Sequence, residues 1–376
     1  MITALFSLIL AAYAGMHLYL FRKITAAFTP PRFVRIGVAV YLVVMSLAPF
    51  LARQLDHDGH PALARVINLP VFIWIAWLFW FFMGGLALDL WNLLARSLRR
   101  PMPACSRLLV SPLSQVQVLF LVIIAATAWS LVEAARPRIR EVTIHNPALS
   151  ALNPIRVVQV SDVHLGMMRS QGWNRMICQR IEALKPDLLV STGDLVDTSM
   201  KNIGNQVDPW AALHPPLGKF AVLGNHEYYL GLTDSLAFHA KAGFHLLRGE
   251  TVALSPSFQI SGVDDKDGSR LGLPCYRDES GLNPTPERNR FSLLLKHQPT
   301  VLAGSTHCFN LQLSGHTHGG QLFPFQGFVL LFYPYLSGLY KPAERFQIYV
   351  SAGTGTWGPP LRLFAAPEIT VFTLTR

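Results

Sequence analysis

Five short motifs with metal-binding side chains occur in order along the C-terminal two-thirds of this chain. They are Asp162-Val163-His164, Gly193-Asp194, Gly224-Asn225-His226-Glu227, the lone His297, and Gly315-His316-Thr317-His318. Together they supply two Asp, one Asn and five His, which is enough for two metal ions with one group left over. Nitrogen and oxygen ligands without sulfur fit Mn, Fe or Zn. The usual task of such a dinuclear metal centre is the hydrolysis of a phosphate ester.

Almost every motif follows a short apolar run that predicts a β-strand. These runs are Ile155–Val160, Asp187–Val190, Phe220–Leu223, Phe291–Leu295 and Phe309–Leu313. A helix is predicted around Trp173–Leu184, so the first two runs form a β-α-β unit with an Asp just past each strand, where ligands gather in α/β sheets.

Further strands are predicted at Gln347–Val350 and Ile369–Leu374. Because strands outnumber helices, the fold class is predicted to be α/β with two facing sheets flanked by helices, and not one doubly wound sheet. The glycines at 193, 224 and 315 are expected to let the backbone turn sharply, so that the next side chain points at the metals.

In this order the five motifs resemble the signature of the calcineurin-like metallophosphoesterases, over roughly Arg156–Arg376. The sequence at 315–321, together with 353–358 and 366–369, resembles a bacterial membrane-associated branch of that family. The branch includes enzymes proposed to cleave the pyrophosphate of UDP-diacylglucosamine. The N-terminal region of this chain departs from the single anchor or export signal that is usual there.

The resemblance implies a role for each motif residue. The first metal is expected to bind Asp162, His164 and His318; the second is expected to bind Asn225, His297 and His316; Asp194 is expected to bridge the two. A hydroxide that bridges the metals would then attack the phosphate. His226 is the best candidate for the catalytic group that contacts the phosphate and protonates the leaving oxygen. Asp197 and Glu227 are expected to orient the ligands.

The N-terminal third is apolar enough to predict a bundle of about four transmembrane helices. The apolar segments are about Ile2–Phe21, Ile36–Leu51, Leu69–Leu94 and Val116–Val132. Trp74, Trp77 and Trp80 recur every three residues and predict a stripe of lipid or helix-packing contacts. The expected organisation is therefore a transmembrane region over 1–135, a linker over 136–153 and a metallophosphoesterase domain over 154–376.

Basic residues in the loops predict the orientation. The first and third loops between the predicted spans together contain 8 Lys and Arg residues. The second loop and the segment after the last span together contain 5. Since basic loops stay in the cytoplasm, both termini are predicted outside. The protein is thus expected to be an integral protein of a bacterial inner membrane with its catalytic domain in the periplasm.

Two features bear on the substrate. The stretch Leu322–Leu336 is rich in Phe and Tyr directly after the last motif, and is either core or an apolar rim that meets the bilayer or an acyl chain. The rim favours a lipid-linked phosphate or pyrophosphate. From Arg136 onward there are 22 Lys+Arg and 18 Asp+Glu, a net of +4 without basic runs, so no nucleic-acid partner is expected.

Three alternatives remain open at this point. The superfamily also contains nucleases and nucleotide phosphodiesterases, and four spans could belong to a non-enzymatic receptor or transporter with a phosphoesterase-like domain. The four cysteines show no CxxC spacing, which argues against thiolate ligation, although a single Cys275–Cys308 bridge is not ruled out.

Overall fold

The computed structural model describes residues 2–376 except 59, 150–152, 167, 271–277 and 283–289. The chain divides into two compact units. A helical unit comprises Met1–Leu131 with Gly358–Pro360, and an α/β unit comprises Val132–Trp357 with Leu361–Arg376. Cys308 is a free thiol, and Cys275 lies outside the described residues.

Each of the four apolar segments is helical. The helices are α1 (Ile2–Phe28), α2 (Arg32–His57), α3 (Pro61–Leu98) and α4 (Pro112–Ala135), with a short 3-10 helix at Pro103–Leu108. Within the described residues, three stretches are long and apolar enough to cross a membrane by length and composition: Arg32–Ala52, Leu63–Leu98 and Pro112–Ala135. That α1 also crosses remains a prediction.

The tryptophan stripe of α3 makes contacts between helices. The indole N–H of Trp74 donates to Nε2 of His17 on α1 at 3.1 Å, and that of Trp77 donates to Oγ1 of Thr127 on α4 at 2.8 Å. On the same helix, Asp89 accepts hydrogen bonds from Tyr19 and Lys23 of α1. Because an unpaired charge in an apolar helix bundle is costly, this pairing explains how the helix accommodates Asp89.

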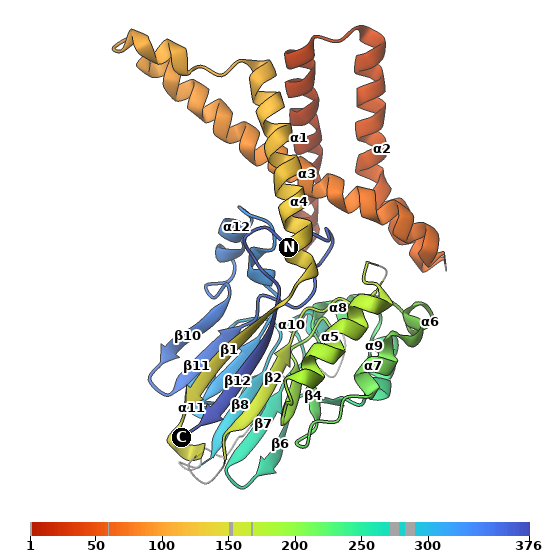
Figure 1. Ribbon diagram of the computed structural model, residues 1–376, viewed down its shortest axis with the longest axis vertical. Helices are drawn as coiled ribbons and strands as arrows, with labels where there is room; N and C mark the ends of the chain where they lie inside the picture. The colour runs from red at the N-terminus through yellow and green to blue at the C-terminus, as the bar shows by residue number, and fades with distance from the viewer. Residues whose placement is uncertain (1, 59, 150–152, 167, 271–277, 283–289) are drawn as a thin grey trace. The chain divides into compact units, whose positions relative to one another are not determined.

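The first sheet of the α/β unit has the strand order β1-β12-β2-β3-β4-β5. Its strands are β1 (Arg138–His145), β2 (Ile155–Val160), β3 (Leu188–Ser191), β4 (Lys219–Ala221), β5 (His245–Leu246) and β12 (Glu368–Thr375). Strands β2 to β5 are parallel, and β12 runs antiparallel to β2. Helices α5 (Gln171–Ala183), α7 (Asp208–Ala211) and α9 (Leu232–Ala242) lie on one side of this sheet (Figure 1).

The second sheet has the order β10-β11-β9-β8-β7-β6. Its strands are β6 (Glu250–Ser255), β7 (Phe258–Gly262), β8 (Phe291–Leu295), β9 (Leu311–Ser314), β10 (Gly338–Ala343) and β11 (Phe346–Val350). The central strands β7, β8, β9 and β11 are parallel. The remaining short helices are α6 (Met200–Ile203), α8 (Asn225–Leu230), α10 (Lys266–Arg270), α11 (Ser305–Cys308) and α12 (Gln326–Leu330).

The two sheets face each other across one apolar core. Successive side chains of a strand point to opposite faces, and both faces are used here. Val157 of β2 joins Leu293 of β8 in the core between the sheets. Val158 instead packs with Ile177 of α5 on the other face, and Leu294 packs with Ile348 on the outer face of the second sheet. The predicted two-sheet α/β fold flanked by helices is confirmed.

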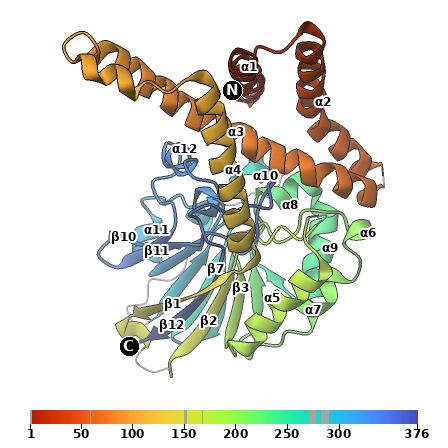
Figure 2. The same ribbon diagram turned by 45° about the horizontal axis from the view of Figure 1, so that its top comes forward.

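The segment expected to be a linker contains a β-strand. Residues Arg138–His145 form β1, which pairs in parallel with β12 along its whole length (Figure 2). Ile144 is 3% exposed and joins the core between the sheets. Five other residues of β1 are exposed, among them the charged Arg138, Arg140 and Glu141, as is typical of an edge strand. Strand β1 thus belongs to the α/β unit, which comprises Val132–Trp357 with Leu361–Arg376.

Candidate metal centre

The motif side chains meet because their strands end at one edge of the paired sheets. Asp162, Asp194 and Asn225 follow the parallel strands β2, β3 and β4 of the first sheet, and His297 and His316 follow the parallel strands β8 and β9 of the second. The carboxyl ends of parallel strands are the usual place for ligands in α/β folds. Polar groups that are far apart in sequence thus come together over the core.

Three overlapping groups of side chains have ligand atoms within 4.8 Å of one another. The groups are Asp162, His164 and His318; His164, Asp194 and His226; and Asp194, His297 and His316. The first group is the same as the first metal set expected from the sequence. The third group contains His297 and His316 of the second expected set together with Asp194. Asp194 also belongs to the middle group. Oδ2 of Asp194 lies 3.2 Å from Nε2 of His297 and 3.9 Å from Nε2 of His164.

The orientation of the imidazoles fits a cation at each position. Nδ1 of His297 donates to the carbonyl of Thr192 at 2.8 Å, and Nε2 faces Oδ1 of Asn225 at 3.1 Å. Nδ1 of His164 likewise donates to Asp197 at 2.9 Å and leaves Nε2 facing Nε2 of His318 at 3.0 Å. Metal-binding histidines usually donate their second N–H in this way. Nitrogen and oxygen ligand atoms that converge in this way suit a metal ion.

The charges in the cluster also favour the binding of cations. Although burial lowers the pKa of His297, the carboxylates of Asp194 and Asp162 raise it well above its usual value. Burial alone would raise the pKa of Asp194, yet the neighbouring His297 and His226 hold it well below its usual range. A buried pocket that favours an ionised carboxylate and a positive charge beside it is suited to divalent cations.

Five of the motif residues have left-handed backbone conformations. The positive φ values are 52° at Asp162, 50° at His164, 53° at Asp194, 73° at His316 and 51° at His318. Such conformations are costly for residues with a Cβ, and they persist where the surrounding structure enforces them. Here the N–H of Asp162 donates to the carbonyl of Gly193, and that of His164 to the carbonyl of Asp194, both at 3.0 Å. The loops hold one another in the conformation that aims the side chains inward.

The sequence led us to expect one role for the three motif glycines, a sharp turn. In the structure they have two different roles. Gly193 has a φ of +96° and does provide the sharp turn. Gly224 and Gly315 are needed for space instead. A Cβ at Gly224 would lie 2.1 Å from Oδ1 of Asp194, and a Cβ at Gly315 would lie 1.9 Å from Oγ of Ser161. Only glycine lets these backbones approach the carboxylates so closely.

Glu227 supports the loop that carries Asp194. Its fully buried carboxylate accepts from the backbone N–H of Asp194 at 2.9 Å, of Leu195 at 2.6 Å and of Gly224 at 2.8 Å. These are charge-assisted hydrogen bonds, which are stronger than neutral ones. Glu227 thus fixes two of the metal-binding motifs relative to each other without facing the cluster itself.

Asp197 links His226 to the cluster. Its two carboxylate oxygens accept from Nδ1 of His226 at 2.7 Å and from Nδ1 of His164 at 2.9 Å. Burial lowers the pKa of His226, but Asp197 and Asp194 outweigh that effect and raise it to about 10. His226 is therefore protonated at neutral pH in this setting, with its Nε2–H available to a ligand.

Arg362 is a residue of the site that no motif revealed. Its fully buried guanidinium donates to the carbonyls of His318, Ala352 and Gly355, and also to Nδ1 of His318 at 3.1 Å. Because a guanidinium only donates, Nδ1 of His318 is the acceptor. Burial and Arg362 together hold the pKa of His318 well below its usual range. Arg362 thus ties the last motif to the 352–355 loop.

Two aromatic rings border the cluster. The ring of Trp357 lies 5.7 Å from that of His226 and is 55% exposed. The ring of Tyr333 lies 5.0 Å from that of His316, and its hydroxyl donates to Gln298 at 2.8 Å. Trp357 belongs to a glycine-rich segment that the resemblance had singled out, whereas Tyr333 had no signal beyond the aromatic content of its neighbourhood.

The aromatic stretch Leu322–Leu336 lies largely at the surface. Its exposed members are Phe323 (52%), Phe325 (43%), Phe328 (43%), Leu330 (50%), Leu331 (77%) and Phe332 (72%), which we call the apolar rim. The stretch is joined to the last motif, since Oγ1 of Thr317 donates to the carbonyl of Leu336 at 2.5 Å. Of the two interpretations of the sequence, buried core does not describe these six side chains.

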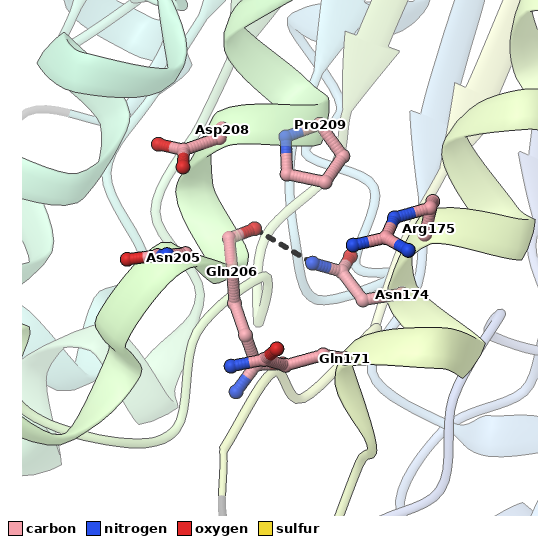
Figure 3. Close-up of a pocket in the computed structure, with 7 residues that line it drawn as sticks. All are labelled: Gln171, Asn174, Arg175, Asn205, Gln206, Asp208 and Pro209. Atoms are coloured by element: carbon pink, nitrogen blue, oxygen red, sulfur yellow. Dashed lines mark hydrogen bonds between the residues drawn. The ribbon is translucent and has the colours of Figure 1, made fainter.

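A separate cavity of about 220 Å³ has no connection with the motifs. It lies between the start of α5 and the 205–209 segment and is lined by Gln171, Asn174, Arg175, Asn205, Gln206, Asp208 and Pro209 (Figure 3). The amide of Asn174 donates to the carbonyl of Gln206 at 2.6 Å (Figure 3). None of these lining residues belongs to a metal-binding group, and we assign the cavity no role.

Comparisons with known proteins agree with this site. The family model of the calcineurin-like phosphoesterases matches residues 155–320. An uncharacterised metallophosphoesterase of Aquifex aeolicus is 42% identical over 66% of this chain and 95% of its own length. A transmembrane protein with a metallophosphoesterase domain from Danio rerio is 29% identical over 95% of this chain and 86% of its own length, so the likeness extends into the helical unit. A solved dimetal phosphatase from Danio rerio shares 13% identity over 59% of this chain and 99% of its own, with a TM-score of 0.36, and supports no functional argument.

The two-sheet fold and its cluster of Asp, Asn and His side chains define a metal-dependent phosphoric ester hydrolase. The chain belongs to the calcineurin-like metallophosphoesterase family. Its apolar helices and its similarity to a transmembrane relative indicate association with a membrane.

Proposed function

We propose that the protein hydrolyses a lipid-linked phosphate or pyrophosphate with two divalent metal ions, at the outer face of a bacterial inner membrane. Asp162, His164 and His318 would hold one ion, and Asn225, His297 and His316 the other. Asp194 would be shared by both ions, which is supported by the placement of its Oδ2 within 3.2 Å of His297 and 3.9 Å of His164. When bound, the ions supply charge stabilisation and an activated water.

The chain's own groups complete the chemistry. His226 holds a proton on Nε2, because Asp197 accepts from Nδ1 and favours the charged ring. It donates that proton to the leaving oxygen as the ester bond breaks. Glu227 keeps the Asp194 loop in place, and the indole of Trp357 packs against the ring of His226.

The apolar rim is the observation that supports a lipid substrate. Six large apolar side chains remain exposed in a segment that contacts the metal cluster through Tyr333 and Thr317. A cluster of exposed apolar groups beside an active site marks a surface for apolar ligands. In a chain with membrane-spanning helices, the occupant is the hydrocarbon part of a lipid substrate held at the bilayer surface.

Substituting Phe328 by aspartate should impair lipid turnover selectively. Loss of one buried phenylalanine contact corresponds to about a 10- to 100-fold lower kcat/KM. We expect this loss for diacylglycerol pyrophosphate in detergent micelles, and less than a twofold change for p-nitrophenyl phosphate. The conservative variant Phe328→Leu keeps the surface apolar and should retain lipid turnover. Equal activity of Phe328→Asp on both substrates would contradict the role of the rim.

The orientation can be tested by fusing a reporter after Arg376. Alkaline phosphatase folds only outside the cytoplasm, so we expect it to be active in this fusion. A fluorescent protein that needs the cytoplasm should remain dark there. The opposite pattern would place the metal cluster on the cytoplasmic face, where nucleotide-linked lipids are available, and these would replace outer-face lipids as the proposed substrates.

A further inference from the structure

Arg169 is a buried arginine with few partners. It lies in the loop after β2, five residues beyond His164, and is only 8% exposed. One of its terminal nitrogens donates to Oγ1 of Thr356 at 2.6 Å, and its guanidinium stacks over Trp173 with its carbon 4.3 Å from the ring centre. Among the described residues no carboxylate pairs with it.

A guanidinium has five N–H groups, and Arg169 uses one of them in a hydrogen bond to the described residues. Within the described part of the chain, Nε of Arg169 and Nε1 of the neighbouring Trp173 are buried without a hydrogen-bond partner. Burying an arginine without a counter-charge is costly, and the desolvation lowers its pKa to about 10. Arg362, the other buried arginine near the metal cluster, satisfies its donors with backbone carbonyls. Arg169 has no such set among the residues that the structure describes.

The position of these unpaired donors indicates what they could bind. Thr356, the partner of Arg169, directly precedes Trp357, whose ring packs on that of His226. The loop of Arg169 also contacts the loop of Asp197, since the N–H of Asp197 donates to the carbonyl of Leu165 at 2.7 Å. Arg169 is therefore linked through Thr356 and Trp357 to His226, the group that would protonate the leaving oxygen.

We propose that Arg169, with the indole N–H of Trp173, binds the second, uncleaved phosphate of a pyrophosphate-linked substrate. This inference rests on the proposed phosphoesterase function and narrows its substrate from phosphates in general to pyrophosphates. The cleaved phosphate lies at the metal cluster, and the leaving group beyond His226 carries the other phosphate. A planar guanidinium with free N–H groups is the side chain that matches two phosphate oxygens.

The test compares two soluble thymidine substrates, which removes any dependence on the lipid. One is the p-nitrophenyl ester of thymidine 5′-phosphate, with a single phosphate, and the other is thymidine diphosphate glucose. In Arg169→Gln we expect kcat/KM for the pyrophosphate to fall about 10- to 100-fold relative to the ester, the usual effect of losing a charge-assisted contact. Arg169→Lys keeps the positive charge but loses the planar set of guanidinium N–H groups. It should lower the ratio of kcat/KM for the pyrophosphate to that for the ester by a smaller factor.

The matched control is Arg175→Gln, an exposed arginine on the next turn of α5, which should leave the ratio unchanged. Metal content and unfolding temperature of each variant check that the cluster is intact. An equal loss on both substrates would mean that Arg169 only supports the Thr356 loop, and an unchanged ratio would mean that water fills the position. A wild-type protein that cleaves the ester but not the pyrophosphate also overturns the inference, while leaving the phosphoesterase function in place. If Arg169→Gln does not fold, the ratio of the two kcat/KM values in Arg169→Lys tests the inference in its place.

Discussion

Replacing Asp194 by asparagine should abolish turnover and reduce the bound metal to at most one ion per chain. The change keeps the shape of the side chain, and an amide oxygen can still accept the hydrogen bond that Oδ1 receives from the N–H of His226. What is lost is a negative charge shared by the histidines of both metal sets. Without it, two divalent cations would repel each other with one carboxylate fewer between them.

Metal analysis and single-turnover rates on the purified full chain measure both effects. Asp208→Asn is the matched control, because Asp208 is an exposed aspartate on α7 that belongs to none of the metal-binding groups. Substantial activity in Asp194→Asn, or active wild-type protein with no more than one ion, would show that the bridged pair of metals is not the catalytic form.

The sequence predicts the central strands well, for a physical reason. Strands β2 and β8 are buried on both faces, so most of their positions are apolar, and their bounds at Ile155–Val160 and Phe291–Leu295 agree with the prediction. Fully buried strands of parallel sheets read as continuous apolar runs. The motifs stand out because each places a polar group immediately after such a run.

Edge strands and single supporting residues could not be found in this way. Strand β1 alternates exposed charges with half-buried side chains and follows directly on α4, so it resembles a polar connection. Arg362 is one arginine among many, and only the fold reveals that it is fully buried beside His318. The exposure of the apolar rim likewise depends on which side chains the rest of the chain leaves uncovered. Propensity and pattern carry no information on such tertiary contacts.

Replacing His226 by alanine should separate the chemistry from the assembly of the metal cluster. The imidazole lies within reach of Asp194 and His164, but the two metal sets are complete without it. We therefore expect His226→Ala to retain its metals and to lose about 10²- to 10⁴-fold in kcat, the usual contribution of a general acid. His214→Ala, which removes an exposed histidine, should change neither quantity.

The dependence on the leaving group identifies what His226 does. p-Nitrophenolate leaves readily without a proton, whereas an alkyl alkoxide needs one, so a general acid matters most for the alkyl ester. His226→Ala should thus lose far more activity on an alkyl phosphate than on p-nitrophenyl phosphate. Asp197→Asn should show the same pattern to a smaller degree, because Asp197 keeps His226 charged and oriented. Equal losses on both esters would indicate that His226 positions the phosphate without protonating the leaving oxygen, and loss of metal would make it a ligand.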